Sequence, residues 1–427
     1  MCPFIPAYKP FTGSKVQAIS LECSFAQFLS KDTSEHLNIQ VETWSSVLDI
    51  SPKWNQLIPE NHCLRVEKLA LLEQSNLPEM AFYYQLILKD GLPLAAFYYQ
   101  LFLIEGKHYH DFSQDDSWAS RNFSRLIRSM KLPMLVCGNL ICNESPGFYL
   151  GPDFRTMKDA SHFINKTFQL ARKQSSASMV LVKDLDTEML ELLTKDGDDW
   201  MNPGEDIVMK LNIRPEWKTF ADYTACLSQK YAARIRKIEK TIHPVTVKTL
   251  GLEEMIALAP QIESLYQQVA TNASVKMGSI NANYLISQKA LMPEDVYCKG
   301  WFENEELIAF SQQIKRDQKL EISYVGMNQE QNRKYSLYHH ILLDGLRDAI
   351  QFGCAELYLG RTAYEAKAIL GCKPETHQNR ILIPNPVIRT AARRFFQWFD
   401  KQRGEEWKKR NPFRDAVIET TTVSSES

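Results

Sequence analysis

The sequence predicts a duplicated α/β fold, in which two layered units each combine a mixed, mostly antiparallel sheet with flanking helices. Three observations predict it. Two aromatic-rich segments, Met80–Gly106 and Val296–Arg316, each read as two strands around a tight polar turn, and they begin 216 residues apart. Helical stretches follow each hairpin. Turn residues gather at 194–205, between the halves. One large sheet that uses all the strands is the alternative arrangement.

Length, charge and cysteine usage set the first limits. A chain of 427 residues favours two domains. We place them at 1–200 and 201–414, with 415–427 as a disordered tail. A net charge of −1 argues against bulk attraction to nucleic acid or to an anionic membrane. No apolar run approaches the ~18 residues of a membrane span, and the first residues lack a signal-peptide layout.

Nine cysteines are scattered singly, without a CxxC pair. This usage predicts reduced thiols in a cytoplasmic protein and neither a disulfide framework nor a zinc site. Motifs for dinucleotides, P-loop phosphates, zinc proteases and serine hydrolases are absent from the sequence. His339 and His340 fall on different faces of one helix, so they do not form a metal site together. We expect no metal and no tightly bound cofactor.

The first half contains the hairpin 80–106, with Asp90-Gly91 at its turn, and helical stretches at Trp118–Met130 and Thr156–Lys173. Its segment Glu144–Phe154 stands where the second half has the polar segment 360–367, but it lacks an equivalent of those polar residues. Pro152 follows the strand there and removes a backbone donor. We therefore expect the first half to be a degenerate copy.

The second half should begin with a strand at Ile207–Ile213 and continue through alternating helices and strands. The predicted elements are helix Trp217–Lys240, helix Glu253–Ala270 broken at Pro260, the hairpin 296–316, strand Leu320–Met327, helices Leu337–Phe352 and Ala363–Leu370, and an amphipathic stretch at Ile388–Arg403.

Positive charge is concentrated in two segments of the second half. Residues 228–248 carry a net +5 and residues 389–414 a net +6, which leaves −12 for the rest. Lys230 and Arg234 lie four residues apart and share a helix face. Solvated helix faces are the plain interpretation. A groove for an anionic ligand, such as coenzyme A phosphates or a transfer RNA end, is the sharper one.

The segment 321–371 reads as strand, polar loop, long helix, strand and a second helix. We expect the loop 328–336 to open into a helix N-terminus, where free N–H groups attract an anion. Arg333 and Lys334 could contact it, and Ser336 is the expected N-cap of the helix beginning at Leu337. An ordinary capped surface loop is the alternative.

The turn that follows the last strand of this segment gathers polar side chains. Gly360 permits close approach, and Thr362 could cap the next helix. Arg361, Tyr364 and Lys367 then place two cations and a phenol near the strand end. Such a group suits an acid-base or anion-holding site, whereas salt-bridged surface residues would be its structural explanation.

This segment resembles the GNAT-fold acyltransferases of the FemAB-like group. The similarity is carried by Tyr324 with Gly326, Leu359-Gly360, Thr362 with Lys367, and Gly371. The basic helix at Leu227–Lys240 also looks like the one that opens the second GNAT unit in Fem-type proteins. The resemblance covers 207–380 and reaches the first half only through its hairpin and layout.

The resemblance implies tandem GNAT-like domains and acyl or aminoacyl transfer to an amine. It implies Glu321 as a candidate base, Tyr364 as a candidate leaving-group acid, and Arg361 and Lys367 as holders of a carboxylate or phosphate. The full set of expected site residues is as follows: catalytic Tyr364, Glu321 and Lys367; substrate-binding Arg361, Gly360, Thr362, Tyr324, Arg234 and Lys230; cofactor-binding Arg333, Lys334 and Ser336.

One departure concerns the donor. Ordinary GNAT enzymes hold the coenzyme A pyrophosphate with a glycine-rich loop, and the segment NQEQNRKYS has no glycine. We expect an N-acyltransferase that uses an acyl-CoA co-substrate and a small amine or amino-acid acceptor. The alternatives are a Fem-type transferase that uses aminoacyl-tRNA and a non-catalytic scaffold that binds an acyl ligand or a partner. The oligomeric state is open.

Overall fold

The computed structural model describes residues 39–414 except 78–79, 106–130, 144, 156, 158, 196–198, 205, 272–278, 387, 391, 395 and 397–409. The predicted helix 118–130 and the predicted tail 415–427 lie outside the described residues, and the predicted amphipathic stretch 388–403 lies largely outside them. Within the described part, no helix is long and apolar enough to cross a membrane.

A single 14-stranded sheet runs through the molecule, with the strand order β1-β2-β3-β4-β6-β14-β8-β13-β12-β11-β10-β9. Its strands are β1 Ile39–Trp44, β2 Met80–Lys89, β3 Leu92–Glu105, β4 Lys131–Cys137, β5 Phe148–Leu150, β6 Met179–Leu185, β7 Trp200–Met201, β8 Asp206–Asn212, β9 Thr246–Leu250, β10 Val296–Glu303, β11 Glu306–Arg316, β12 Lys319–Met327, β13 Glu356–Tyr358 and β14 Lys373–Leu382. The strands β5 and β7 lie off this path and pair with β3 and β14.

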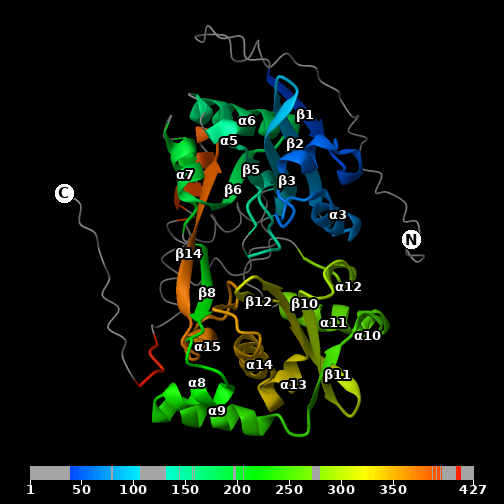
Figure 1. The fold of residues 1–427 in the computed structure, drawn as a ribbon, viewed down its shortest axis with the longest axis vertical. Coiled ribbons are helices and arrows are strands. Elements are labelled where there is room, and N and C mark those ends of the chain that lie inside the picture. Colours follow the sequence, from blue (N-terminus) through cyan, green and yellow to red (C-terminus); the bar gives the residue numbers. More distant parts are fainter. Residues whose placement is uncertain are drawn as a thin grey trace, which may run out of the picture.

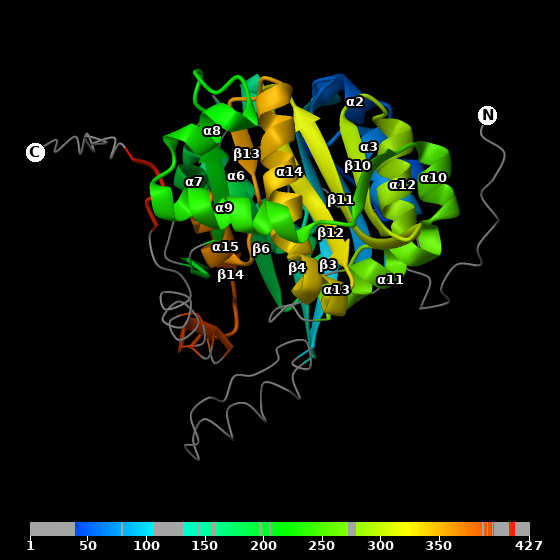
Figure 2. The ribbon, with the colours of Figure 1, turned by 90° about the horizontal axis from the view of Figure 1, so that it is seen from below.

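Helices cover both faces of this sheet (Figure 2). They are α2 Lys53–Leu57, α3 Val66–Gln74, α5 Pro152–Arg155, α6 Ala160–Gln174, α7 Thr187–Thr194, α8 Phe220–Cys226, α9 Gln229–Thr241, α10 Leu252–Ala257, α11 Ala259–Ala270, α12 Ala282–Leu291, α13 Gln329–Tyr335, α14 Leu337–Gln351 and α15 Tyr364–Ala368. In the second half, α8, α9 and α14 line one core, while α10, α11 and α12 share another with α3 of the first half.

The same strand pattern occurs twice. In β1-β2-β3-β4-β6 the first three pairings are antiparallel and the last, β4 with β6, is parallel. The series β9-β10-β11-β12-β13 repeats this arrangement and ends in the parallel pair β12 and β13. A helix of 15 residues precedes the last strand in each series, α6 and α14 respectively. The predicted fold class, a duplicated mixed sheet flanked by helices, is confirmed.

The strand β14 joins the two series into one sheet. Its residues 373–377 pair with β8, and from Gln378 onward it pairs with β6 of the first half. Figure 1 shows this long strand running from the lower group of elements to the upper one. The continuous sheet, which was the alternative arrangement, therefore coexists with the duplication.

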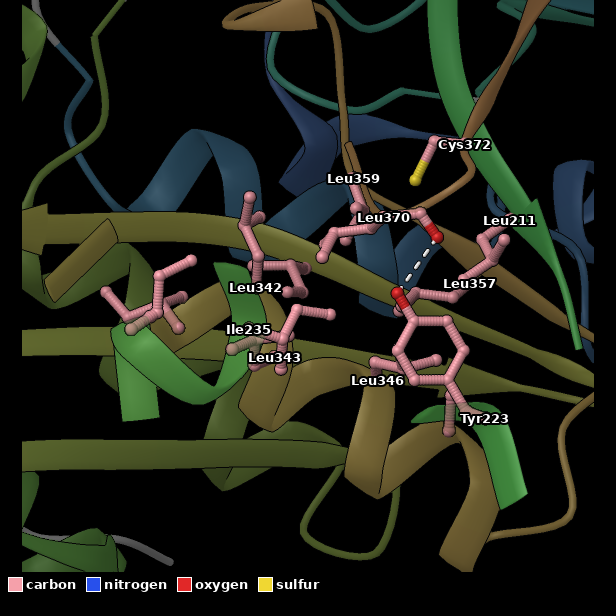
Figure 3. Close-up of a cluster of buried hydrophobic side chains, with 14 of the residues drawn as sticks. Leu211, Tyr223, Ile235, Leu342, Leu343, Leu346, Leu357, Leu359, Leu370 and Cys372 are labelled. Carbon is pink, nitrogen blue, oxygen red and sulfur yellow. Dashed lines mark hydrogen bonds between the residues drawn. The ribbon is translucent and has the colours of Figure 1, made fainter. Parts of the chain in front are cut away.

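The core of the second half fixes the elements around 357–372. Leu342, Leu343 and Leu346 on α14 pack against Leu357 and other buried side chains of β8, α8 and α9 (Figure 3). The hydroxyl of Tyr223 donates a hydrogen bond to the carbonyl oxygen of Leu370, 3.1 Å away. Burial without a partner would cost a hydroxyl roughly 1–3 kcal/mol, so this bond ties the segment after α15 to α8.

Several predicted elements need correction. The single helix expected at Trp217–Lys240 is two, α8 and α9, because Leu227 bridges to Phe413 and the N–H of Ser228 donates to the carbonyl of Pro412. The break at Pro260 is confirmed, since α10 ends at Ala257 and the proline lies in the first turn of α11. The polar loop expected at 328–336 is instead the helix α13, which Asn328 caps by accepting from the N–H groups of Glu330 and Gln331.

Candidate functional site

The parallel strands β12 and β13 separate soon after they meet. Their pairing covers three positions and ends at Glu321 opposite Tyr358. Beyond this point β13 stays with β8, because the N–H of Leu359 donates to Met209 and the N–H of Met209 donates to Gly360. A bulge at Ser323 turns β12 at the same place, since Ile322 pairs with Gln313 but Tyr324 pairs with Gln312. We call this opening of the ladder the strand split.

Glu321 lies at the entrance of the strand split. Its side chain is 14% exposed, and its Oε1 accepts a hydrogen bond of 2.6 Å from Nδ2 of Asn143. The guanidinium of Arg316 approaches Oε2 only to 3.9 Å, and this arginine side chain is 46% exposed. The carboxylate is thus held on one oxygen, while a loosely paired, accessible cation lies beside the other.

A segment of the first half reaches this place. The strands β4 and β5 both pair with β3, with Cys137 opposite Tyr99 and Phe148 opposite Phe97, so they continue one another along it. The chain leaves that line between them at 138–147, a segment described except for residue 144, which we call the finger. The hydroxyl of Tyr324 donates to the carbonyl of Ile141 in the finger at 2.5 Å. The candidate site is therefore built from both halves.

Arg361 is the main connection between the finger and the second half. It donates to Oδ1 of Asn143 at 2.7 Å and to the carbonyl of Asn143 at 2.7 Å. It also donates to both carboxylate oxygens of Asp206, at 2.7 and 3.2 Å. Burial by itself would raise the pKa of Asp206, but the Arg361 guanidinium outweighs it and lowers that pKa to about 2. The role predicted for Arg361, binding a substrate anion, disagrees with this geometry because protein groups already occupy the guanidinium.

Lys367 is enclosed. Its side chain is 1% exposed, and its Nζ donates to the carbonyl of Gly360 at 3.0 Å. Burial lowers the pKa of Lys367 to about 7. The predicted role of holding a phosphate or carboxylate disagrees with this burial. Tyr364, on the same short helix, is also buried and packs in the core of the second half.

The two predicted helix caps need correction. The residue before α15 is Ala363 in the left-handed region, and Thr362 is exposed without capping the helix. Ser336 does stand directly before α14, but it too is left-handed, with φ of 57°, and its side chain makes no capping hydrogen bond. Oδ1 of Asn332 accepts from the N–H of Tyr338 instead. Because α13 runs directly into α14, an α13 side chain performs the capping.

The remaining expected ligand-binding residues lie on helices. Arg333 and Lys334 are exposed at the end of α13, and Lys334 pairs with Glu303 at 3.0 Å. Lys230 and Arg234 are exposed on α9. An open pocket of about 690 Å³ adjoins α9, and its lining includes Arg236 and Arg414. Among the described residues, no group of three or more acidic, histidine or cysteine side chains could hold a metal ion.

The sequence did not indicate Asn143, Asp206 or Arg316 as site residues. Asn143 lies in a segment of turn residues, and Asp206 begins a strand far from Arg361 along the chain. Both come close only because β14 and the finger join the halves. Arg316 ends a predicted strand, where a charged residue is ordinary. The one signal in the sequence is that Asn143 is a polar residue in a turn, and this signal covers neither Asp206 nor Arg316.

Comparison with known proteins gives fold neighbours only. No protein-family model matches the sequence, and a search of curated proteins finds no match. The structural neighbours include FemX and tandem GNAT proteins. A structure of FemX has a TM-score of 0.45 at 10% identity, covering 76% of this chain and 97% of that one. A tandem GNAT protein from the clavulanic acid biosynthesis pathway has a TM-score of 0.48 at 11% identity, covering 82% and 99%.

L-PGS from Bacillus licheniformis has a TM-score of 0.41 at 13% identity, covering 78% of this chain and 95% of that one. The names FemX and tandem GNAT protein match the group that the sequence resembles. At such identities and TM-scores these neighbours assign neither an activity nor a residue to this protein.

Proposed function

We propose that this protein is an N-acyltransferase, which moves an acyl group from an acyl thioester to the amine of a small acceptor. The observation that carries the proposal is the position of Glu321. Its carboxylate lies at the last β12–β13 pair, fixed on one oxygen by Asn143 and next to the partly exposed Arg316. An amine nucleophile needs such a base, because only its neutral form attacks a carbonyl.

The proposed step balances as follows. Glu321 takes a proton from the acceptor ammonium, directly or through one water, and the freed nitrogen attacks the thioester carbon. The β12–β13 ladder ends at Glu321, so the backbone N–H groups of β12 beyond it are the candidates to stabilise the oxyanion. The C–S bond then breaks, the sulfur leaves with a proton as the free thiol, and the nitrogen gives up its second proton as the amide forms. Tyr364 remains the candidate donor of that proton.

Arg316 favours an acceptor that carries a carboxylate. Its side chain is 46% exposed and its guanidinium approaches Glu321 only to 3.9 Å, so within the described residues it has donors to spare. A carboxylate of the acceptor could take two of them in the fork geometry that arginine offers. The ammonium of an amino acid would then lie near Glu321, which suits amino-acid acceptors better than simple amines.

The test is a transfer assay with purified protein, a panel of acyl-CoAs and a panel of amines and amino acids, read by thiol release. Glu321→Gln should lower kcat by about 100-fold or more, the usual contribution of a general base. Glu253→Gln, an exposed glutamate on α10, is the matched control and should be neutral. Thiol release that Glu321→Gln leaves unchanged would overturn the proposal.

The second candidate, transfer from aminoacyl-tRNA, is favoured by the open pocket beside α9 and its Arg236 and Arg414. Phosphates of a polynucleotide would release counterions from such a surface, so binding should weaken steeply with salt. Charged tRNA should then support transfer where acyl-CoAs do not, and Arg236→Glu should abolish it. Ligand binding without transfer from either donor would identify a non-catalytic scaffold.

A further inference from the structure

We infer that the first half of the chain completes the site of the second half, with Asn143 acting as the positioning residue for Glu321. The inference rests on the proposed function and extends it. Four side chains form one hydrogen-bonded series, from Asp206 through Arg361 and Asn143 to Glu321. Three of them belong to the second half, and Asn143 is the only member from the finger.

The chemistry of Arg361 fixes the orientation of the Asn143 amide. A guanidinium has only donors, so the amide atom at 2.7 Å from it has to be the oxygen. The amide nitrogen therefore points to Glu321, where it donates to Oε1 at 2.6 Å. Because this donor occupies Oε1, Oε2 is left to take a proton from substrate. The amide of asparagine can accept from the arginine and donate to the glutamate at the same time.

The series is held firmly on the side away from Glu321. Both carboxylate oxygens of Asp206 accept hydrogen bonds from the guanidinium of Arg361, which also donates to the carbonyl of Asn143. The finger is tied at other points as well. The buried Lys183 donates to the carbonyl of Asn139 at 3.0 Å, and Asp184 accepts from the N–H of Ser145 at 3.1 Å. A finger anchored on both sides of Asn143 can hold the Glu321 side chain in one rotamer, which a catalytic geometry requires.

In the first half, the hydrogen bonds of Lys183 and Asp184 with the finger lie where the parallel pair β4 and β6 separates, which is the counterpart of the strand split. There the parallel pair β4 and β6 ends at Cys137 opposite Val182, and the next β6 residues are Lys183 and Asp184. Both bind the finger, as described above. The first half thus uses its own opening to anchor the finger, whose tip serves the second half. One active site built from two halves follows from this arrangement.

The first experiment measures kinetics in the full-length protein. Asn143→Ala should lower kcat about tenfold and leave the KM of the acyl donor unchanged. Asn143→Asp places a second carboxylate beside Glu321, so the acidic limb of the pH–rate profile should move to higher pH. Asn212→Asp, on an exposed position of β8, is the control and should keep the wild-type profile. A wild-type profile in folded Asn143→Asp would overturn the inference.

The second experiment does not depend on turnover. Asn143→Ala and Glu321→Gln are combined, and the urea midpoints of unfolding are compared for the four proteins. Coupled residues should make the double variant less destabilised than the two single effects predict together. Additive shifts would overturn the inference even if the enzyme is active. Coupling in a protein that transfers no acyl group would instead keep the positioning contact and reject the proposed function.

Discussion

The side-chain nitrogen of Lys367 is bound to the carbonyl oxygen of Gly360, 3.0 Å away, while the side chain is 1% exposed. A single neutral acceptor does not compensate a buried ammonium, which is why burial lowers the pKa of Lys367 to about 7. Gly360 adopts φ of +79°, so the bond also holds the turn after β13 in a conformation that favours glycine.

This relationship predicts a pH-dependent stability. The folded pKa of about 7 lies below the ordinary value of 10.5, so the unfolded chain binds more protons between them. The free energy of unfolding should therefore gain up to about 1.4 kcal/mol per pH unit from pH 7 to 9. Lys367→Met should lose this gain, as measured by urea unfolding at several pH values. The exposed Lys218→Met should retain it, and equal slopes in both variants would contradict the prediction.

The ion pair between Asp206 and Arg361 predicts the opposite behaviour in acid. The pKa of Asp206 is about 2 in the folded chain, below its ordinary 3.8, so its contribution is present above pH 4 and is lost as the pH falls toward 2. Asp206→Asn should cost about 2 kcal/mol at pH 7, because the partly buried arginine keeps only the more distant carboxylate of Asp184, 3.6 Å away, and much less at pH 2.5. Thermal unfolding at the two pH values checks this.

The control for that measurement is Asp317→Asn. Asp317 is an exposed turn residue in the left-handed region, which asparagine also adopts readily. It should change stability little at either pH. If Asp206→Asn destabilises the protein equally at both pH values, the ion pair does not account for the loss.

Gly326 in β12 leaves no room for a side chain. A Cβ there would lie 2.2 Å from a ring carbon of Phe310 and 2.7 Å from the backbone nitrogen of Tyr266. Gly326→Ala should destabilise the protein by about 2 kcal/mol or more, because α11 would have to move away from the sheet. Gly251→Ala, whose Cβ would meet its nearest neighbour at 3.6 Å, should cost clearly less. Urea denaturation of both variants distinguishes steric crowding at Gly326 from an effect that any glycine-to-alanine substitution would have.

The role of Tyr364 stays a prediction, and the leaving group can test it. If the Tyr364 hydroxyl protonates the departing sulfur, Tyr364→Phe should lower kcat about tenfold with an acyl-CoA donor. The loss should shrink with a thioester of a more acidic thiol, which leaves without help. Tyr231→Phe on α9 serves as the control. The same loss with both donors would assign Tyr364 a packing role instead.

The sequence predicted well what depends on neighbouring residues. The hairpin at Asp90-Gly91 and the second one at Asn304-Glu305 form as expected. Their turns adopt positive φ, which Asp90, Gly91 and Asn304 tolerate well and which is unusual only at Glu305. The strand β12, the helix α14 and the break before Pro260 follow equally from local patterns. The helix α13 also had a local signal, since Asn328 is a good N-cap and strong helix formers follow it.

The candidate site depends on contacts that no local pattern encodes. Glu321 was expected, but the residue that orients it, Asn143, is 178 positions away along the chain. Asp206 meets Arg361 across 155 positions. The same separations explain why Arg361 and Lys367 were expected to face a substrate. Both are cations near a strand end. Only the folded chain shows that Arg361 is paired with Asp206 and that Lys367 is buried.

Because β14 pairs with β8 over its first five residues and with β6 over the rest, it is an inner strand for both halves at once. A gene fragment that ends near residue 200 would therefore leave β6 as a bare edge, ready to pair with another chain. A fragment that begins near residue 201 would contain β14 without β6, the strand with which the end of β14 pairs. Truncation experiments on this protein should keep the halves together or supply them in trans.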